Sequence, residues 1–117
     1  MVSVMAGSFT WSANVRVGTL KPYAKALVIT VVHDIERFDS EKGASTSAIW
    51  NTIVCFRKTL REEIEGTLAP GDLVHFQGNV RTTTFTDDAD ATRRAVDLVA
   101  TGYDILHKHI DELPSAI

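Results

Sequence analysis

The fold of this chain is decided by residues 48–86, which read AIWNTIVCFRKTLREEIEGTLAPGDLVHFQGNVRTTTFT. The alternation of side chains along Ala48–Phe56 predicts a β-strand. Because successive side chains of a strand point to opposite faces, Trp50 and Phe56 share one face. Cys55 falls on the other face, where we expect a buried and unreactive thiol.

Helical spacing follows this strand. Apolar residues recur four positions apart from Leu60 to Leu68 and line one face of a short helix. Thr59, with Glu62 three residues later, is a capping-box signature and predicts the start of the helix. Residues 69–72, Ala-Pro-Gly-Asp, end the helix in a turn.

A second strand, Leu73–Val80, follows the turn. Val74 and Phe76 share one face, and His75 lies on the other. Gly78 interrupts the inner row of side chains, as a glycine does at a β-bulge or at the corner of a barrel. The pattern therefore predicts a strand that bends where Gly78 lies.

Strand-like patterns also occupy residues 8–20, 26–33 and 94–106. Residues 36–46 are polar and predict a hairpin loop, and residues 82–92 are β-prone at first and then acidic and loop-like. Five strands, with one short helix between the third and the fourth, are the order of an all-β OB-fold. We expect a partly open Greek-key barrel whose end is plugged by the helix.

Size and composition limit the class of protein. A length of 117 residues suits one domain, and 44% hydrophobic with 23% charged residues excludes general disorder. The sequence has no apolar run of membrane-spanning length, and residues 1–10 do not resemble a signal peptide. The only cysteine, Cys55, favours a reducing compartment, so we expect a cytoplasmic protein. We assign residues 1–107 to the OB-fold domain and 108–117 to a short C-terminal extension.

The net charge of −3 argues mildly against a nucleic-acid-binding protein. This negative charge is unevenly distributed along the chain. Residues 104–117 contain three acidic residues and one basic residue and so carry −2 of the net charge. The rest of the chain is close to neutral, so local patches matter more than the total.

The aromatic residues point to a nucleic-acid surface. A soluble domain normally buries Trp and Phe. Aromatic rings on the outer face of a sheet, with basic residues nearby, suit the stacking of unpaired bases. The face of Trp50 and Phe56 is therefore a candidate base-stacking surface.

Several motifs extend this interpretation. Ile49–Lys58 has a Trp, an apolar run, a Phe and a Lys, and Pro70–Arg81 follows the pattern GxxVxxxGxLR with Val in place of Leu. Phe85–Asp87 is similar to WTD, and Gly102–Leu106 to a Gly-aromatic-Asp-Leu strand end. In these motifs the chain resembles the bacterial single-stranded DNA-binding protein family, and most closely its divergent actinobacterial members. The resemblance covers most of residues 26–106.

The resemblance implies a role for each matching residue. Trp50, Phe56 and Phe85 occupy the base-stacking positions of the family, and Lys58 and Arg81 match basic positions near the bound strand. It also implies a homotetramer, with single-stranded DNA as the partner in replication, recombination or repair. Neither stacking nor phosphate contacts read sequence, so binding is expected to be largely non-specific.

The chain departs from the family on its hairpins. An ungapped count places Glu36 where the family has a further tryptophan, and Phe38, two residues on and on the same face, is the candidate substitute. Thr82–Thr84 stands where the family is richer in basic residues, and residues 87–90 are acidic. Arg94 is a candidate phosphate contact. We expect weaker binding than in a typical member.

The family also has a long Gly/Pro/Gln-rich linker and an acidic tip, which do not follow the domain in this sequence. Asp111–Pro114 is only faintly similar to such a tip. We therefore do not expect protein partners recruited through a tail.

Each candidate also has an ordinary structural interpretation. Trp50 and Phe56 can instead pack in a core or a subunit interface, and Phe85 can pack within its own hairpin. Lys58 can be a solvated surface lysine, and Arg81 can pair with an acidic neighbour.

Two further alternatives concern the cations after the second strand. The acidic neighbours available to Arg81 are Asp97 and Asp87. Arg93 and Arg94 can form a solvated rim rather than phosphate contacts.

The sequence gives little indication of a metal site or of a catalytic site. His107 and His109 alternate, but a third metal ligand at a suitable spacing is missing from the sequence. The acidic run at residues 87–90 lacks the glycine and the distant glutamate of a calcium loop. We expect no metal site, no cofactor and no enzymatic activity.

The leading hypothesis is a sequence-independent single-stranded DNA-binding module. A primosome-type dimeric OB protein, which touches DNA and a helicase loader, is the first alternative. The second is a protein-interaction domain that kept the barrel and lost DNA binding, which the acidic balance allows.

Overall fold

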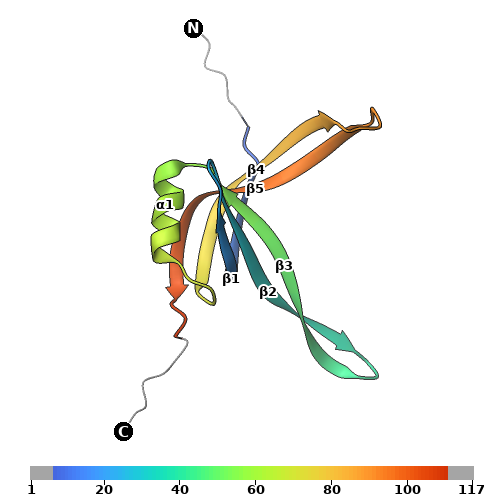
Figure 1. Cartoon of the computed structure of the whole chain (residues 1–117). Coiled ribbons are helices and arrows are strands. Elements are labelled where there is room, and N and C mark those ends of the chain that lie inside the picture. Colours follow the sequence, from blue (N-terminus) through green and yellow to red (C-terminus); the bar gives the residue numbers. More distant parts are fainter. Residues whose placement is uncertain (1–6, 111–117) are drawn as a thin grey trace.

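Five strands and one helix make up residues 7–110, the part of the chain that the computed structural model describes (Figure 1). The elements are β1 (Thr10–Pro22), β2 (Leu27–Asp39), β3 (Gly43–Cys55), α1 (Lys58–Thr67), β4 (Leu73–Thr86) and β5 (Thr92–His107). The predicted order of strands, with the helix between the third and the fourth, is confirmed.

The strands form a closed barrel in the order β1-β2-β3-β5-β4. All neighbouring pairs are antiparallel except β3 and β5, which are parallel. This parallel seam is short, because only Ile53 and Val54 of β3 have register partners, Leu98 and Val99, on β5. The barrel that we expected to be partly open is therefore closed, although β3 and β5 are joined over a short length only.

The core is built from the inward-facing side chains of the strands, as the alternation predicts. Phe76, Ile53 and Cys55 have at most 1% of their surface exposed, which confirms the buried position of the thiol. Ile64 of α1 and Leu68 just beyond it join the same cluster, so the helix covers one end of the barrel. Burial of these apolar groups is the main source of stability for the fold.

Two hairpins extend beyond the barrel (Figure 1). We call residues 34–48 the β2–β3 arm and residues 81–97 the β4–β5 arm; each is a two-stranded ribbon. The prediction of a loop over residues 36–46 was wrong, because both strands continue there and only 40–42 connect them. Polar side chains can occupy both faces of a ribbon that covers no core, so the strand pattern is lost.

The bend predicted at Gly78 is confirmed. The pairing of β4 with β5 shifts register between Gln77 and Gly78. A Cβ atom added to Gly78 would lie 1.7 Å from the carbonyl oxygen of Val99. Only glycine therefore permits the close approach of the two backbones at this bulge.

The start of α1 differs from the prediction. The N-cap is Arg57, whose carbonyl accepts the Arg61 N–H at 2.9 Å, and no side chain in the described residues caps the helix. Thr59 is therefore already inside the first turn, so the predicted capping box with Glu62 was wrong. β3 ends at Cys55 and α1 already begins at Lys58, so the helix starts too early for Thr59 to be its N-cap.

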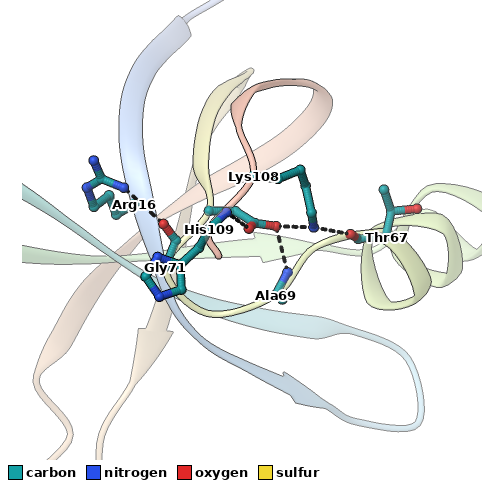
Figure 2. Close-up of polar contacts among 7 residues, drawn as sticks. Arg16, Thr67, Ala69, Gly71, Lys108 and His109 are labelled. Carbon is teal, nitrogen blue, oxygen red and sulfur yellow. Dashed lines mark hydrogen bonds and ion pairs between the residues drawn. The ribbon is translucent and has the colours of Figure 1, made fainter. Parts of the chain in front are cut away.

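A buried carboxylate joins the turn after α1 to the segment after β5 (Figure 2). Asp72 accepts hydrogen bonds from the backbone N–H groups of Ala69 at 2.9 Å and His109 at 2.8 Å. The ammonium group of Lys108 also donates to Asp72, and to the carbonyl oxygen of Thr67 at 2.8 Å. We call these five residues the Asp72 clamp.

The clamp sets the charge state of its carboxylate. Burial by itself raises the pKa of Asp72, but the hydrogen bond from Lys108 and those from the His109 and Ala69 backbones outweigh it, so the pKa is lowered. The start of the predicted C-terminal extension is therefore bound to the barrel. Residues 111–117, with the faintly tail-like Asp111–Pro114, lie outside the described residues, and the proposed domain limits stay a prediction.

Candidate nucleic-acid interface

The aromatic residues singled out in the sequence lie on the surface. The exposed fractions are 60% for Trp50, 36% for Phe56, 51% for Phe85 and 83% for Phe38. None of them packs in the barrel core, because that core is formed by other side chains. The four rings are therefore free of any role in the core and lie where a ligand could reach them.

The Trp50 ring lies beside a position of β1 that has no side chain. This position is Gly18, where an added Cβ would come within 2.6 Å of the Trp50 ring. Trp50 pairs with Val32 of β2, which in turn pairs with Arg16 of β1, so the three side chains share the outer face. Sequence reasoning missed Gly18, whose only signal was a glycine inside a strand pattern.

Phe56 lies at the end of β3 and is covered on one side by Arg81 of β4. The guanidinium carbon of Arg81 is 4.4 Å from the centre of the Phe56 ring, which is cation–π geometry. Arg81 also forms an ion pair with Asp97, with 3.5 Å between Nη2 and Oδ2. The structure thus brings two predicted site residues together and also places an acidic partner beside them.

The β4–β5 arm separates the other two predicted residues. Phe85 pairs directly with Arg93 across the arm, whereas Arg94 pairs with Thr84. Because directly opposite residues share a face and neighbours in a strand alternate, Phe85 and Arg94 lie on opposite faces. Arg94 therefore does not stand beside the Phe85 ring.

The cation directly opposite Phe85, Arg93, is already paired. The Arg93 guanidinium donates a hydrogen bond of 2.7 Å to Asp87. That bond, followed by those from the backbone N–H groups of Ala91 and Ala89, lowers the pKa of Asp87. Asp87 is thus an anchor of the turn at the end of the arm.

The remaining predicted residues lie apart from these. Phe38 sits near the end of the β2–β3 arm, paired with Ala44, and Figure 1 shows this arm diverging from the β4–β5 arm. Lys58 is the first residue of α1 and is exposed, two residues after Phe56. The stacking candidates therefore spread over two arms and the barrel wall between them.

Other kinds of site find little support in the described residues. Among residues 7–110, no three His, Cys, Asp or Glu side chains gather as metal ligands. Burial raises the pKa of the Cys55 thiol above its ordinary value, so it is a poor nucleophile. In the same part of the chain, no helix has the length and apolar character needed to cross a membrane.

Three solved structures with the same fold are described as single-stranded DNA-binding proteins. The complex of a Plasmodium falciparum SSB with ssDNA matches with a TM-score of 0.62 and 14% identity, over 92% of this chain and 100% of that one. The small single-stranded DNA-binding protein of Streptomyces coelicolor has a TM-score of 0.56 and 19% identity, over 86% and 95% of the two chains. The mitochondrial single-stranded DNA-binding protein of S. cerevisiae has a TM-score of 0.63 and 14% identity, over 90% and 100%. At these identities the likeness establishes the fold.

The family follows from the sequence itself. No curated protein matches the chain. The model of the Single-strand binding protein family matches residues 12–106, which span all five strands and the helix. The predicted family and its OB-fold are confirmed, and the chain belongs to the single-strand binding protein family.

Proposed function

We propose that the chain binds single-stranded DNA without regard to sequence, by stacking bases on exposed aromatic rings and holding phosphates with nearby cations. The observation that carries this proposal is the exposure of Trp50 on the outer wall of a barrel that belongs to this family. The fold leaves most of this indole ring in water, at a position where the family stacks a base.

The stacking roles fall to Trp50, Phe56 and Phe85, with Phe38 extending the surface along the other arm. A base stacked on an aromatic ring contributes about 1–3 kcal/mol, and every base has a face to offer. The Trp50 ring lies beside Gly18, which has no side chain to displace it. Contact with β1 limits the positions that the ring can adopt, and a side chain with fewer positions loses less entropy on binding.

The phosphate roles fall to Lys58 and Arg81, with Arg94 serving a segment that crosses the opposite face of the β4–β5 arm. Each phosphate neutralised on a single strand contributes about −0.7 to the slope of log affinity against log salt. Arg81 and Arg93 each have a carboxylate partner within the chain. We therefore expect weak binding with a shallow salt slope.

Assembly follows from the same architecture. The two arms are two-stranded ribbons with unpaired outer edges, and Phe9 before β1 is 73% exposed. Unpaired edges and exposed apolar groups are commonly covered by a second subunit. We propose a homo-oligomer, a tetramer or a dimer, of OB-fold domains that protects DNA strands in the cytoplasm during replication, recombination or repair, with no catalytic step.

An oligo-dT titration tests the proposed function. The tryptophan emission, which comes from Trp50 and Trp11, should be quenched as the oligonucleotide binds, and most of this quenching should be lost in Trp50→Ala. Light scattering in the same solution gives the stoichiometry. Trp50→Ala and Phe56→Ala should each weaken binding by about fivefold or more, as expected for the loss of one stacked base. Tyr23→Ala is the matched control, because Tyr23 is an exposed aromatic residue at the end of the barrel between β1 and β2. Unchanged emission at low salt would rule out the proposal.

One observation favours a second candidate, a protein-interaction domain. The arm cations Arg81 and Arg93 are paired with carboxylates, which leaves less positive charge for a nucleic acid. Under this alternative the exposed rings would contact a protein, and oligo-dT would not quench Trp50 at any salt concentration. The same titration therefore separates the two candidates.

A further inference from the structure

The ion pair between Arg81 and Asp97 lies within the proposed binding surface. We propose that Asp97 is a built-in competitor for the DNA phosphate at Arg81, so that binding exchanges an internal anion for an external one. This inference rests on the proposed function, because it concerns the regulation of the same site. It makes Asp97 an affinity-limiting residue of this chain.

The position of Asp97 is fixed by the strand register. Arg81 of β4 and Asp97 of β5 are directly opposite each other at the base of the β4–β5 arm, so their side chains share a face. The side chains are 51% and 36% exposed, so both reach water and an incoming phosphate can approach them. Within residues 7–110, Arg81 is the only ion-pair partner of Asp97.

The geometry of Arg81 leaves it ready for exchange. Its guanidinium carbon lies over the Phe56 ring, 4.4 Å from the ring centre, and this contact holds the group at the surface beside a candidate stacking residue. The 3.5 Å between Arg81 and Asp97 is longer than a charge-assisted hydrogen bond of about 2.7–2.9 Å. Asp97 therefore holds Arg81 by charge, and the donors stay available for two phosphate oxygens.

The other acidic residue of the arm has a different task. Asp87 also pairs with an arginine, but it accepts hydrogen bonds from the backbone N–H groups of Ala89 and Ala91 in the turn. Loss of Asp87 would change the turn as well as the charge. Asp97 has no such backbone bond among the described residues, so its charge can be removed without altering the arm.

The effect of Asp97 on the affinity for DNA is expected to be modest. An exposed ion pair shifts an equilibrium by at most about fivefold, so Asp97 weakens binding without preventing it. Its carboxylate would also repel a phosphate at Arg81, because the two lie within the Debye length of about 8 Å at physiological salt. The charge of Asp97 thus lowers both the affinity and the number of phosphates that are effectively neutralised.

The test is Asp97→Asn, measured by the anisotropy of a labelled oligo-dT over a series of salt concentrations. We expect about threefold to fivefold tighter binding at low salt. The slope of log affinity against log salt should steepen by about 0.7, the share of one further phosphate. Asp88→Asn is the matched control, because it removes the same charge from the end of the same arm, where no arginine is paired with it in the described residues.

A double-mutant cycle assigns the effect to Arg81. In an Arg81→Ala background, Asp97→Asn should no longer change the affinity. Thermal unfolding checks that each variant folds, and Asp97→Ser serves if Asp97→Asn does not. An unchanged slope, an equal gain from Asp88→Asn, or a gain that persists without Arg81 would overturn the inference while leaving DNA binding intact. Absence of binding in both the wild type and Asp97→Asn would overturn the proposed function as well.

Discussion

Truncation of Asp72 to alanine should destabilise the fold more than any substitution of an exposed acidic residue. The Asp72 side chain is buried, and its bonds to Ala69 and His109 join the turn after α1 to the segment after β5. Asp72→Ala removes the acceptor for two backbone N–H groups and one ammonium group at once. The segment after β5 would then lose most of its attachment to the turn after α1, while β5 itself stays paired with β4.

The size of the effect follows from the contacts. A hydrogen bond to a charged group contributes about 1.5–3 kcal/mol, and the lower value applies here because Ala69 and His109 are themselves exposed. The two backbone bonds then account for about 3 kcal/mol of unfolding free energy. Lys108 has a half-exposed side chain and adds at most about 1 kcal/mol.

The assay is urea unfolding followed by circular dichroism, at one protein concentration because the stability of an oligomer depends on it. Asp72→Ala should lose about 3–4 kcal/mol, which corresponds to roughly 12–30 °C in the unfolding midpoint of a domain of this size. Asp104→Ala, at an exposed carboxylate, should stay within about 0.5 kcal/mol of wild type. Lys108→Met should cost about 1 kcal/mol or less.

A loss of less than about 1 kcal/mol in Asp72→Ala would refute this reasoning. It would mean that water replaces the carboxylate as the acceptor for both N–H groups. An equal loss in Asp72→Ala and Lys108→Met would place the energy in the ion pair instead of in the backbone bonds.

Two other predictions follow from the same structure. The pKa of Asp72 is lowered on folding, so its contribution to stability is present above the unfolded-state pKa of about 3.9 and is lost as the pH falls through the lower folded-state value. Asp72→Asn should flatten the acid limb of stability measured against pH, and an unchanged limb would contradict this. Gly78→Ala should prevent normal folding, because its Cβ would overlap the Val99 carbonyl, whereas Gly66→Ala should add about 0.5–1 kcal/mol, because Gly66 lies in a helix with open space around it. Thermal unfolding of the two alanine variants checks this contrast, and similar midpoints would contradict it.

The barrel could be predicted from the sequence because its signals are local. In a strand with one buried face, apolar and polar residues alternate. In the helix, apolar residues recur every four positions, and Gly78 marks the position of the bulge. The arms could not be predicted to their full length, because residues 36–46 of the β2–β3 arm pack on no core and so show no alternation. Strand pairing outside a core leaves little trace in a single sequence.

The site was predictable in its residue types and only partly in its arrangement. The exposure of Trp50 and Phe85 follows from their place on an outer face, and the pairing of Arg81 with Asp97 was one of the alternatives. The contact of Arg81 with Phe56 joins β4 to the end of β3, two strands that are not neighbours in the barrel, and no local pattern in the sequence indicates such a contact.

The Asp72 clamp shows the same limit. It joins Asp72 to Lys108 and His109, which lie 36 and 37 positions further along the chain. The Pro-Gly-Asp pattern predicts the turn and nothing about these partners. A tertiary partner this distant leaves no periodic mark.

The seam between β3 and β5 has a mechanical consequence. β3 and β5 are paired through two residue pairs, whereas every other pair of neighbouring strands has at least six. One side of this junction carries Trp50 on β3, and the other carries Asp97 on β5, opposite Arg81. A nucleic acid that contacts Trp50 and Arg81 would cross the junction with the fewest paired residues, so its binding would hold β3 and β5 together where the barrel itself does so least.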